Sequence, residues 1–280
     1  MAGIYVNDTG TWKLPKSIWI NQLGTWRVCK NVYVNSGGAW KELIKTVDIT
    51  SNQSNFNLHS YLGSPSQALS VVVNLNSNVV ISSSNTSGNR TPAFTVGNFP
   101  TGSTVIINNN GYISGGGGFG GSAGYRDGSN FYEPSNGSAG GDGIVKGSSN
   151  NFDITIVNTG TIAGGGGGGA GGEYRYLCPP VSPNIYDSGC GWANGNTGGQ
   201  GAGITGASRT QGGSPMTFNP YNNNPTPNTA TGGAGGALGE RGADNKVTSG
   251  VRIRTGGAGG KAISGNIEIA VSGTIIGVIG

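Results

Sequence analysis

Glycine dominates this chain and limits the folds that it can adopt. There are 57 glycines among 280 residues, and most of them gather in short runs. The runs occupy residues 115–124, 137–143, 164–172, 195–206, 232–242 and 256–260. Ordering glycine costs more conformational entropy than ordering any other residue, so a flexible linker is the simplest interpretation. Strand-like or aromatic segments bracket each run, however, and a tether would not need them.

Ordered polyglycine has a physical solution, the left-handed helix with three residues per turn and no internal hydrogen bonds. Its N–H and C=O groups must then bond to neighbouring segments. Without Cβ atoms, several such helices can pack backbone to backbone, with N–H···O and weaker Cα–H···O contacts between them. The runs therefore predict a sandwich of packed polyglycine II helices. No helix opening with Lys-Ser or Lys-Thr follows any run, which argues against a phosphate-binding loop.

Strand-like segments lead into two of the runs through similar turns. Residues 105–118 read VIINNNGYISGGGG, and residues 154–167 read ITIVNTGTIAGGGG. Residues 267–277, IEIAVSGTIIG, keep the strand and the turn but lack the glycine run. This pattern predicts strands at the base of the glycine segments.

Three tandem repeats open the chain at 14-residue intervals, IYVNDTGTWK from Ile4, IWINQLGTWR from Ile18 and VYVNSGGAWK from Val32. Each alternates apolar and polar residues into an Asn, with a Gly three positions later. That spacing suits a type I turn ending in a left-handed glycine, so each repeat is predicted to be a strand–turn–strand unit.

Six aromatic residues occupy equivalent positions in the repeats. They are Trp12, Trp26 and Trp40 after the turns, and Tyr5, Trp19 and Tyr33 before them. They can simply fill the core of a very small β-domain. Alternatively, three copies in one chain form a pseudo-threefold cap on the end of a trimeric shaft. A separate domain of about 45 residues with little apolar content would be only marginally stable alone, which favours a partner.

Between the repeats and the glycine runs the chain is rich in strand signals. Segments 70–75, 78–81, 93–96 and 103–107 are apolar or β-branched and are separated by Asn, Ser, Gly and Pro turns. No helix signal competes with them. We expect an all-β fold with non-regular polyglycine II, divided into a repeat domain (1–46), a β-rich connector (47–110) and a glycine-rich domain with loops (111–280).

Most of residues 50–280 resemble the tail-fibre tip adhesins of bacteriophages, including the distal long-tail-fibre adhesins of T-even phages and glycine-rich host-specificity proteins. The matching features are TPAFTVGNFPTGSTV from Thr91, the NNGYI and NTGTI entries into glycine, GGKAISG from Gly259 and SGTII from Ser272. In that family the resemblance implies an attachment domain on a trimeric fibre, a polyglycine II sandwich and variable loops that bind the host surface. One adhesin per shaft trimer is expected.

If glycine helices leave a base and return to it, successive loops alternate between tip and base. Loops 125–136 and 173–194 then lie at the tip, and both are rich in residue types that contribute most at interfaces. The predicted receptor-binding residues are Tyr125, Arg126, Phe131, Tyr132, Tyr174, Arg175, Tyr176, Tyr186 and Trp192. Strict alternation places loop 207–231 at the base, although this depends on whether 195–206 is one helix or two. With one helix, residues 237–254 form a third tip loop.

The residues argue against several other functions. The net charge of +4 comes from scattered basic residues, so no nucleic-acid partner is expected. Asp127, Glu133, Glu173 and Asp187 show no spacing that singles out a catalytic pair. We expect no enzyme activity, no cofactor and no metal, and His59 is given a packing or surface role. The alternatives are a tailspike-like glycan depolymerase, a fibre-assembly chaperone and, less well supported, an ice-binding protein.

Cys29, Cys178 and Cys190 do not form a disulfide framework, although the last two could pair. Neither a membrane-spanning apolar run nor a signal-peptide pattern is present, so synthesis in the host cytoplasm is expected. The sequence as a whole predicts a receptor-binding adhesin at the distal tip of a virion's tail fibre. Its expected partners are a trimeric shaft and an outer-membrane protein or glycan of the bacterial surface.

Overall fold

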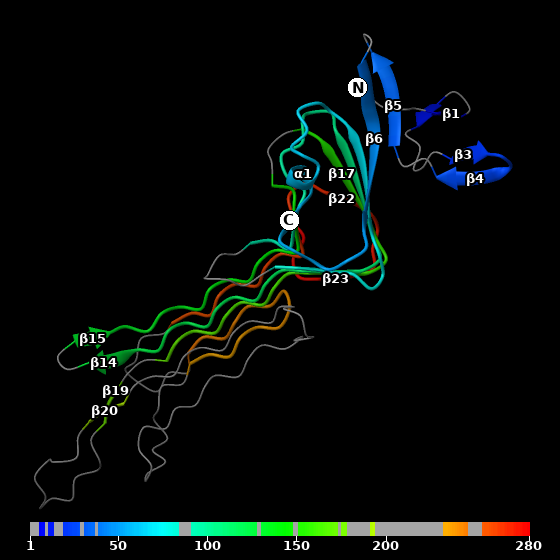
Figure 1. The fold of residues 1–280 in the computed structure, drawn as a ribbon. Helices are drawn as coiled ribbons and strands as arrows, with labels where there is room; N and C mark the ends of the chain where they lie inside the picture. Colours follow the sequence, from blue (N-terminus) through cyan, green and yellow to red (C-terminus); the bar gives the residue numbers. More distant parts are fainter. Residues whose placement is uncertain are drawn as a thin grey trace, which may run out of the picture.

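The computed structural model describes residues 6–8, 11–13, 19–28, 31–36, 39–83, 91–127, 130–147, 151–172, 175–177, 191–193, 232–245 and 254–280. Within these ranges regular structure is almost entirely β, with one short helix, α1 (Leu58–Tyr61). The predicted all-β class is confirmed. A parallel β-coil with three sheets, which we call the prism for its triangular cross-section, occupies the middle of the molecule. Hairpins extend from one end of it, and a bundle of glycine-rich segments extends from the other (Figure 1). We call this bundle the stem.

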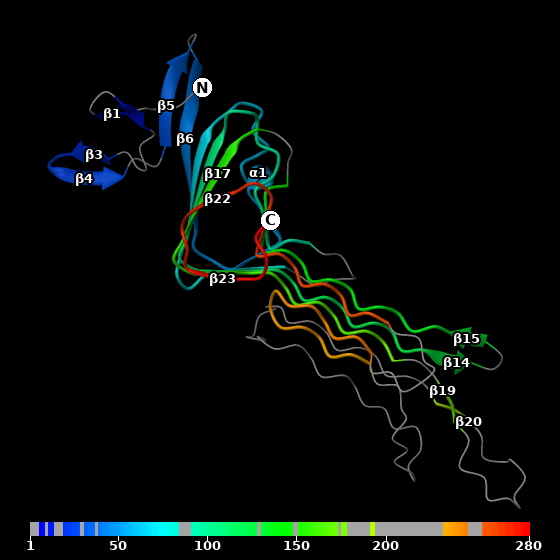
Figure 2. The same cartoon turned by 180° about the vertical axis from the view of Figure 1, so that it is seen from behind.

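Three sheets form the prism, as the two opposite views show (Figures 1 and 2). The six-stranded sheet contains β5 (Asn31–Ser36), β6 (Ala39–Ile49), β9 (Ser70–Leu75), β12 (Thr104–Asn109), β17 (Asp153–Asn158) and β22 (Glu268–Val271). The five-stranded sheet contains β7 (Gln53–Ser54), β10 (Val80–Ser82), β13 (Tyr112–Ser114), β18 (Thr161–Ala163) and β23 (Thr274–Ile276). The four-stranded sheet contains β8 (Phe56–Asn57), β11 (Phe94–Thr95), β16 (Ile144–Val145) and β21 (Ile263–Ser264).

The chain visits the three sheets in the same order on each turn, so it winds as a parallel coil. All strand pairs within these sheets are parallel, except the antiparallel pair of β5 and β6. Such a coil stacks each turn on the one before it, and equivalent residues form columns. The sequence predicted most of the strands, but the coil joins residues too far apart for local patterns to reveal.

Alternating apolar residues explain the core of the prism. Val71, Val73 and Leu75 of β9 are all buried, while the residues between them are half-buried and face outward. The rings of Phe56 and Phe94 lie 5.2 Å apart in one column, and the parallel register continues that column through Ile144 and Ile263. A period of two with apolar residues at the inward positions is the pattern that a one-sided strand requires.

Buried amides close one corner of the prism. The Nδ2 of Asn109 donates to the Oδ1 of Asn158 at 2.7 Å, and both side chains are completely buried. The same Asn109 Oδ1 accepts the N–H of Gly111 at 3.2 Å. The Nδ2 of Asn158 in turn donates to the carbonyl oxygen of Thr274 at 3.3 Å. Buried polar groups need such partners, so these asparagines fix the corner between the six-stranded and five-stranded sheets.

Each N-terminal repeat forms an antiparallel hairpin, which confirms the predicted strand–turn–strand units. The hairpins are β1 (Val6–Asp8) with β2 (Thr11–Lys13), β3 (Trp19–Gln22) with β4 (Thr25–Val28), and β5 with β6. Each pairs its Asn with its Trp, Asn7 with Trp12, Asn21 with Trp26 and Asn35 with Trp40. The repeated sequence therefore encodes a repeated register.

The turn of the second repeat differs from the predicted type I. Leu23 has φ 53° and Gly24 has φ 80°, so both central residues are left-handed, as in a type I′ hairpin turn. The N–H of Gly24 donates to Oδ1 of Asn21 at 2.9 Å. Two-residue turns of this type match the twist of the flanking strands, which is the physical reason for the difference.

The connector strands lie close to their predicted positions, in β9, β10, β11 and β12. The prediction that no helix competes with them is wrong at one place, where α1 follows β8. The Asn57 side chain caps this turn by accepting the Ser60 N–H at 3.0 Å. Strand β6 runs across the expected boundary at residue 46, and strands from both sides of residue 110 share all three sheets.

Two excursions leave the prism at the same corner and form the stem. The first lies between β13 and β16, and the second between β18 and β21. The outward segment of the second excursion, residues 164–172, begins directly after β18. It is completely buried within the stem. The prism is therefore the base that the glycine-entry motifs predicted.

Candidate functional site

Hydrogen bonds connect the stem segments at every third residue. The N–H groups of Gly118, Gly121 and Gly124 donate to the carbonyls of Gly166, Gly169 and Gly172, at 2.7, 2.8 and 2.9 Å. A second series runs from residues 165, 168 and 171 to the carbonyls of residues 141, 138 and 135. A three-residue period means that each segment presents three lengthwise faces, each of which can contact a different neighbour.

The segment 164–172 is the centre of the stem and contacts neighbours on all three faces. A Cβ atom on Gly167 would lie 1.9 Å from the carbonyl oxygen of Gly257. On Gly168 it would lie 1.9 Å from that of Phe119, and on Gly169 it would lie 1.9 Å from that of Gly233. Since real Cβ atoms do not approach backbone this closely, none of the three faces can carry a side chain over residues 164–169; the first side chain of the segment is the buried methyl group of Ala170. This geometry explains the unbroken run of glycine from 164 to 169.

Polar side chains satisfy backbone groups on the outside of the stem. The Asn136 Oδ1 accepts the Thr255 N–H at 3.0 Å, and the Asp142 Oδ1 accepts the Lys261 N–H at 2.7 Å. The Asp244 carboxylate accepts the Gly256 N–H at 3.0 Å and pairs with Arg241. The Gly256 N–H lowers the pKa of Asp244 most strongly; burial acts in the opposite direction, and Arg241 lowers the pKa further. Polar residues within and beside the glycine runs therefore cap exposed edges of the stem.

A hairpin of β14 (Tyr125–Asp127) and β15 (Asn130–Tyr132) lies at the far end of the stem from the prism (Figure 1). Its antiparallel register places Tyr125 opposite Tyr132 and Arg126 opposite Phe131. Directly opposed residues on antiparallel strands share a face of the hairpin. Successive pairs lie on opposite faces, so the backbone places Tyr125 beside Tyr132 on one face and Arg126 beside Phe131 on the other, and Tyr132 is 42% exposed.

An ion pair anchors the root of this hairpin. The Glu133 Oε2 lies 2.9 Å from the Arg254 Nη2, and the arginine is the less exposed partner. The Arg254 N–H also donates to the Asn245 Oδ1 at 2.9 Å. Sequence reasoning missed this arrangement and treated Glu133 only as an acidic residue without a catalytic partner. No local signal could have revealed a pair separated by 121 positions.

A second hairpin, β19 (Arg175–Leu177) with β20 (Gly191–Ala193), also lies at the far end of the stem (Figures 1 and 2). It pairs Tyr176 with Trp192 and Arg175 with Ala193. Each hairpin thus contains one directly opposed pair of aromatic residues and one arginine in its first strand. Tyr174 and Tyr186 lie outside the described residues, so their predicted role remains a prediction.

The described aromatic residues of the N-terminal hairpins include two that are exposed. Trp26 is 62% exposed and Tyr33 is 50% exposed. Trp12, Trp19 and Trp40 lie in β2, β3 and β6, and their backbones occupy equivalent hairpin positions. Tyr5 lies outside the described residues. Large aromatic side chains exposed on a protein surface are typical of contact sites.

Residues 232–239 run toward the prism, not away from it. The N–H groups of Gly233, Gly236 and Gly239 donate to the carbonyls of Ala170, Gly167 and Gly164, each at 2.8 Å. Gly164 follows β18 directly, so Gly239 lies at the base. If residues 195–206 formed one helix and the loops alternated strictly between tip and base, this segment would run outward. That prediction is therefore wrong. Loop 207–231 itself lies outside the described residues.

A turn at the base connects this inward segment to the next outward one. Leu238 is buried there and packs with Ala163, Tyr112 and Ile276. Burial raises the pKa of Tyr112. The first part of segment 237–254 is therefore at the base, contrary to the expectation of a third tip loop over that whole range. Residues 246–253 lie outside the described residues.

The remaining candidate residues form no catalytic or metal site within the part of the chain that the structure describes. His59 contacts the Phe99 ring edge-on at 5.2 Å, which confirms its packing role. Glu173, Asp187 and all three cysteines lie outside the described residues. Within the described ranges, no three His, Cys, Asp or Glu side chains come together as a metal site requires. In the same ranges, no helix is long and apolar enough to cross a membrane.

Comparison with known proteins now decides the family. The family model of the phage tail fibre adhesin Gp38 matches residues 44–280. The chain belongs to this family. It is a tail-fibre adhesin, a receptor-binding protein of the bacteriophage virion that serves attachment to the host.

One solved structure also resembles the adhesin, the gp37-gp38 adhesin tip complex of the bacteriophage S16 long tail fiber. It has 23% sequence identity and a TM-score of 0.47, and the match covers 86% of this chain and 83% of that chain. No curated protein matches the chain.

Proposed function

We propose that the adhesin sits at the distal tip of the tail fibre and binds the bacterial outer surface through its two tip hairpins, β14–β15 and β19–β20. The observation that carries this proposal is the pair of aromatic residues directly opposed in each hairpin, Tyr125 with Tyr132 and Tyr176 with Trp192, at the end of the stem remote from the prism. Tyr, Trp and Arg contribute most to binding energy at interfaces. A rigid support lowers the entropy lost on binding. The receptor is an outer-membrane protein or a surface glycan.

The stem is proposed to consist of polyglycine II helices. Its hydrogen bonds recur at every third residue, and this is the period of that helix. Its segments donate their N–H groups to one another and not within themselves, which is the second expectation for this structure. Such a stem would hold the tip hairpins at a fixed distance from the fibre.

The N-terminal hairpins are proposed to attach the adhesin to a trimeric tail-fibre shaft, with one adhesin per trimer. Three hairpins with the same Asn–Trp register support this proposal, because one chain can then offer similar contacts to three shaft chains. The exposed Trp26 and Tyr33 side chains supply apolar contact area on two of them.

The adhesin is proposed to bind without catalysis. Among the acidic residues weighed for a depolymerase, Glu133 is held in an ion pair with Arg254. A depolymerase would shorten purified host polysaccharide, and a fibre-assembly chaperone would be missing from purified particles. We expect intact polysaccharide and an adhesin band in the particles.

The double variant Arg126→Ala/Phe131→Ala tests the tip. We expect adsorption to host cells to fall at least about 30-fold, because the loss of even one strong interface contact costs about 2 kcal/mol. Thermal unfolding should change little, since the hairpin lies beyond the stem. Glu240→Gln, at the exposed base turn, is the control and should adsorb normally. Unchanged adsorption of the double variant would refute the assignment of this hairpin.

Co-purification with the fibre shaft tests attachment. Trp26→Ala/Tyr33→Ala should lose the shaft while still folding, because both side chains are exposed. Thr25→Ala, on the same hairpin, should retain it. Full retention of the shaft by the aromatic variant would contradict the proposed attachment surface.

A further inference from the structure

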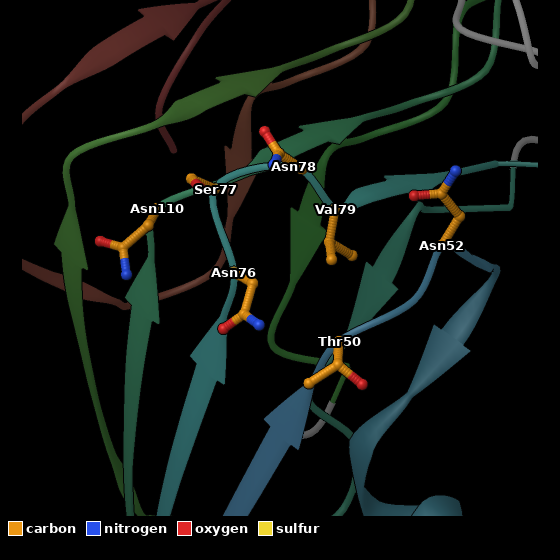
Figure 3. Close-up of a pocket in the computed structure, with 7 residues that line it drawn as sticks. All are labelled: Thr50, Asn52, Asn76, Ser77, Asn78, Val79 and Asn110. Carbon is orange, nitrogen blue, oxygen red and sulfur yellow. The ribbon is translucent and has the colours of Figure 1, made fainter.

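A polar pocket lies on the prism at the corner between the six-stranded and five-stranded sheets. Its volume is about 540 Å³, and it is lined by Thr50, Asn52, Asn76, Ser77, Asn78, Val79 and Asn110. We call it the corner pocket. Its lining comes from three successive turns of the coil, with Asn76 between Asn110 on one side and Thr50 on the other (Figure 3). The volume falls within the range of small-molecule sites.

The corner pocket exists because one turn of the coil is longer than its neighbours. Residues 76–79 connect β9 to β10, whereas only residues 110–111 connect β12 to β13. The longer turn rests directly on Gly111, where a Cβ atom would lie 2.4 Å from the Val79 carbonyl oxygen and 2.5 Å from that of Asn76. The turn therefore projects beyond the corner and forms one wall of the pocket.

The backbone around the corner pocket is held in place. The Val79 N–H donates to the Asn76 carbonyl at 3.1 Å, and the Val79 side chain is buried. The Asn52 Oδ1 accepts the Val80 N–H at 2.9 Å. The Asn110 Oδ1 accepts the Thr159 hydroxyl at 2.6 Å, which leaves the amide NH₂ of Asn110 as a donor. Such a frame limits the entropy lost when a ligand binds.

Three side chains of the projecting turn have no hydrogen-bond partner within the described part of the chain, those of Asn76, Ser77 and Asn78. Each asparagine amide can donate two hydrogen bonds and accept two, and the serine hydroxyl can do both. A second row of amides continues along the outer face of the sheet beside them. There the Asn108 Nδ2 donates to the Asn74 Oδ1 at 2.8 Å, and the Asn74 Nδ2 donates to the Asp48 Oδ1 at 2.9 Å.

The lining chemistry selects among ligand classes. Among the residues that the structure describes, no charged side chain lines the corner pocket, so an anion or a cation would lose hydration there without gaining a counter-charge. Val79 is its one apolar side chain and is buried, so an apolar ligand would gain little. Hydroxyl groups, in contrast, donate and accept in the same way as amides. We propose that the corner pocket binds the hydroxyl groups of an uncharged carbohydrate, as a glycan contact separate from the tip hairpins.

The test uses the full chain with three probes, maltohexaose, β-1,4-mannohexaose and hexagalacturonate. Binding is followed by the NMR shifts of the asparagine side-chain amides during titration. We expect at least one neutral sugar to saturate in the millimolar range, because a few solvent-exposed hydrogen bonds act without aromatic stacking. The amides of Asn76 and Asn78 should shift, and hexagalacturonate should bind at least tenfold more weakly. Absence of saturation by both neutral sugars would overturn the proposal.

Variants localise the binding. Asn76→Ala/Asn78→Ala should weaken the dissociation constant at least tenfold, while Asn266→Ala, an exposed asparagine elsewhere on the prism, should leave it unchanged. Asn76→Asp keeps the shape of the side chain and should also weaken binding, so a folding defect in the alanine variant does not decide the result. The tip variant Arg126→Ala/Phe131→Ala should bind the sugar normally. Undiminished binding in both corner variants would refute the corner pocket as the site.

Discussion

The central and outer segments of the stem are both rich in glycine but differ in how many side chains they carry. Residues 164–169 are all glycine, and each of the three faces of this segment contacts the backbone of a different neighbour. In the outer segment 135–143, Gly137 and Gly140 face carbonyl oxygens at 1.9 and 2.1 Å, while Asn136, Ser138 and Ala139 carry side chains. The number of neighbouring segments therefore sets how many of every three consecutive positions must be glycine. We call this the neighbour rule.

An intermediate case supports this rule. In the segment 256–260, Gly256 and Gly259 face one neighbour, and Gly257 and Gly260 face another. Only Ala258 points outward, where it is exposed. Two occupied faces thus leave one position in three for a side chain. In this stem the positions of glycine indicate which faces are buried, as the positions of apolar residues do in a strand.

The largest expected effect is at the centre of the stem. Gly167→Ala would place its methyl group 1.9 Å from the Gly257 carbonyl oxygen, in a segment that has a neighbouring backbone on each of its three faces. We expect a loss of about 4 kcal/mol or more in the free energy of unfolding, because no flexible side chain can move away. Thermal unfolding measures it. A stability equal to that of the parent would break the proposed rule.

An inward position of an outer segment should matter less. Gly118→Ala would meet the Ser138 carbonyl oxygen at 2.0 Å. This segment can shift outward, since neighbours do not surround it, so we expect a loss of about 2 kcal/mol. Chemical denaturation of Gly118→Ala beside Gly167→Ala provides the comparison. Equal losses in the two variants would show that the number of neighbours does not matter.

Removing a polar cap should have a smaller effect. Ser138 Oγ accepts the Phe119 N–H at 2.6 Å on a half-buried edge of the stem. Ser138→Ala should cost about 1 kcal/mol, the typical value of one hydrogen bond. Ser138→Thr keeps the hydroxyl and should recover most of the loss in the same denaturation experiment. If threonine restores nothing, the hydroxyl is not the source of the effect.

Acid should loosen one outer edge slightly. The pKa of Asp244 is lowered by the Gly256 N–H and by Arg241. A carboxylate with a lowered folded-state pKa stabilises the fold above its unfolded value of about 3.9, and the contribution is lost as the pH falls through the folded pKa. The hydrogen-exchange protection of the Gly256 amide should therefore fall in this acid range. Asp244→Asn should remove this pH dependence, and a variant with the parent's profile would contradict the assignment.

The smallest effect belongs to the outward position. Ala258→Ser adds a hydroxyl on the exposed face of its segment, so the free energy of unfolding should change by less than about 0.5 kcal/mol. A clear loss of stability, seen in the same thermal scans, would mean that this face contacts something in the folded adhesin.

The sequence predicted the local units better than their assembly. Each Asn–Trp hairpin and the strands of β9, β10, β11 and β12 follow from periods and turn residues within a few positions. The column through Phe56, Phe94, Ile144 and Ile263 does not, because it depends on stacking between coils whose members are separated by the two excursions. The direction of residues 232–239, toward the prism, could not be predicted either, because a glycine run does not indicate which of its ends lies at the base.

In the candidate site, too, local features could be predicted from the sequence but long-range contacts could not. The aromatic and arginine residues of loop 125–136 could be selected by type, and their hairpin brings Tyr125 beside Tyr132 and Arg126 beside Phe131. The Glu133–Arg254 pair and the corner pocket could not be selected, because both depend on contacts between distant coils or segments. Residue type thus indicates which loops bind, and long-range geometry decides how they are held.

The most direct test of the neighbour rule is an alanine scan of every glycine in residues 115–143, 164–172 and 256–260, read by thermal stability of the purified adhesin. The rule predicts that every position from 164 to 169 is intolerant. It also predicts that the strongest losses in the outer segments recur at every third residue, at positions such as 118, 121, 137 and 140. Uniform tolerance across the central segment, or losses in the outer segments without a three-residue period, would contradict it.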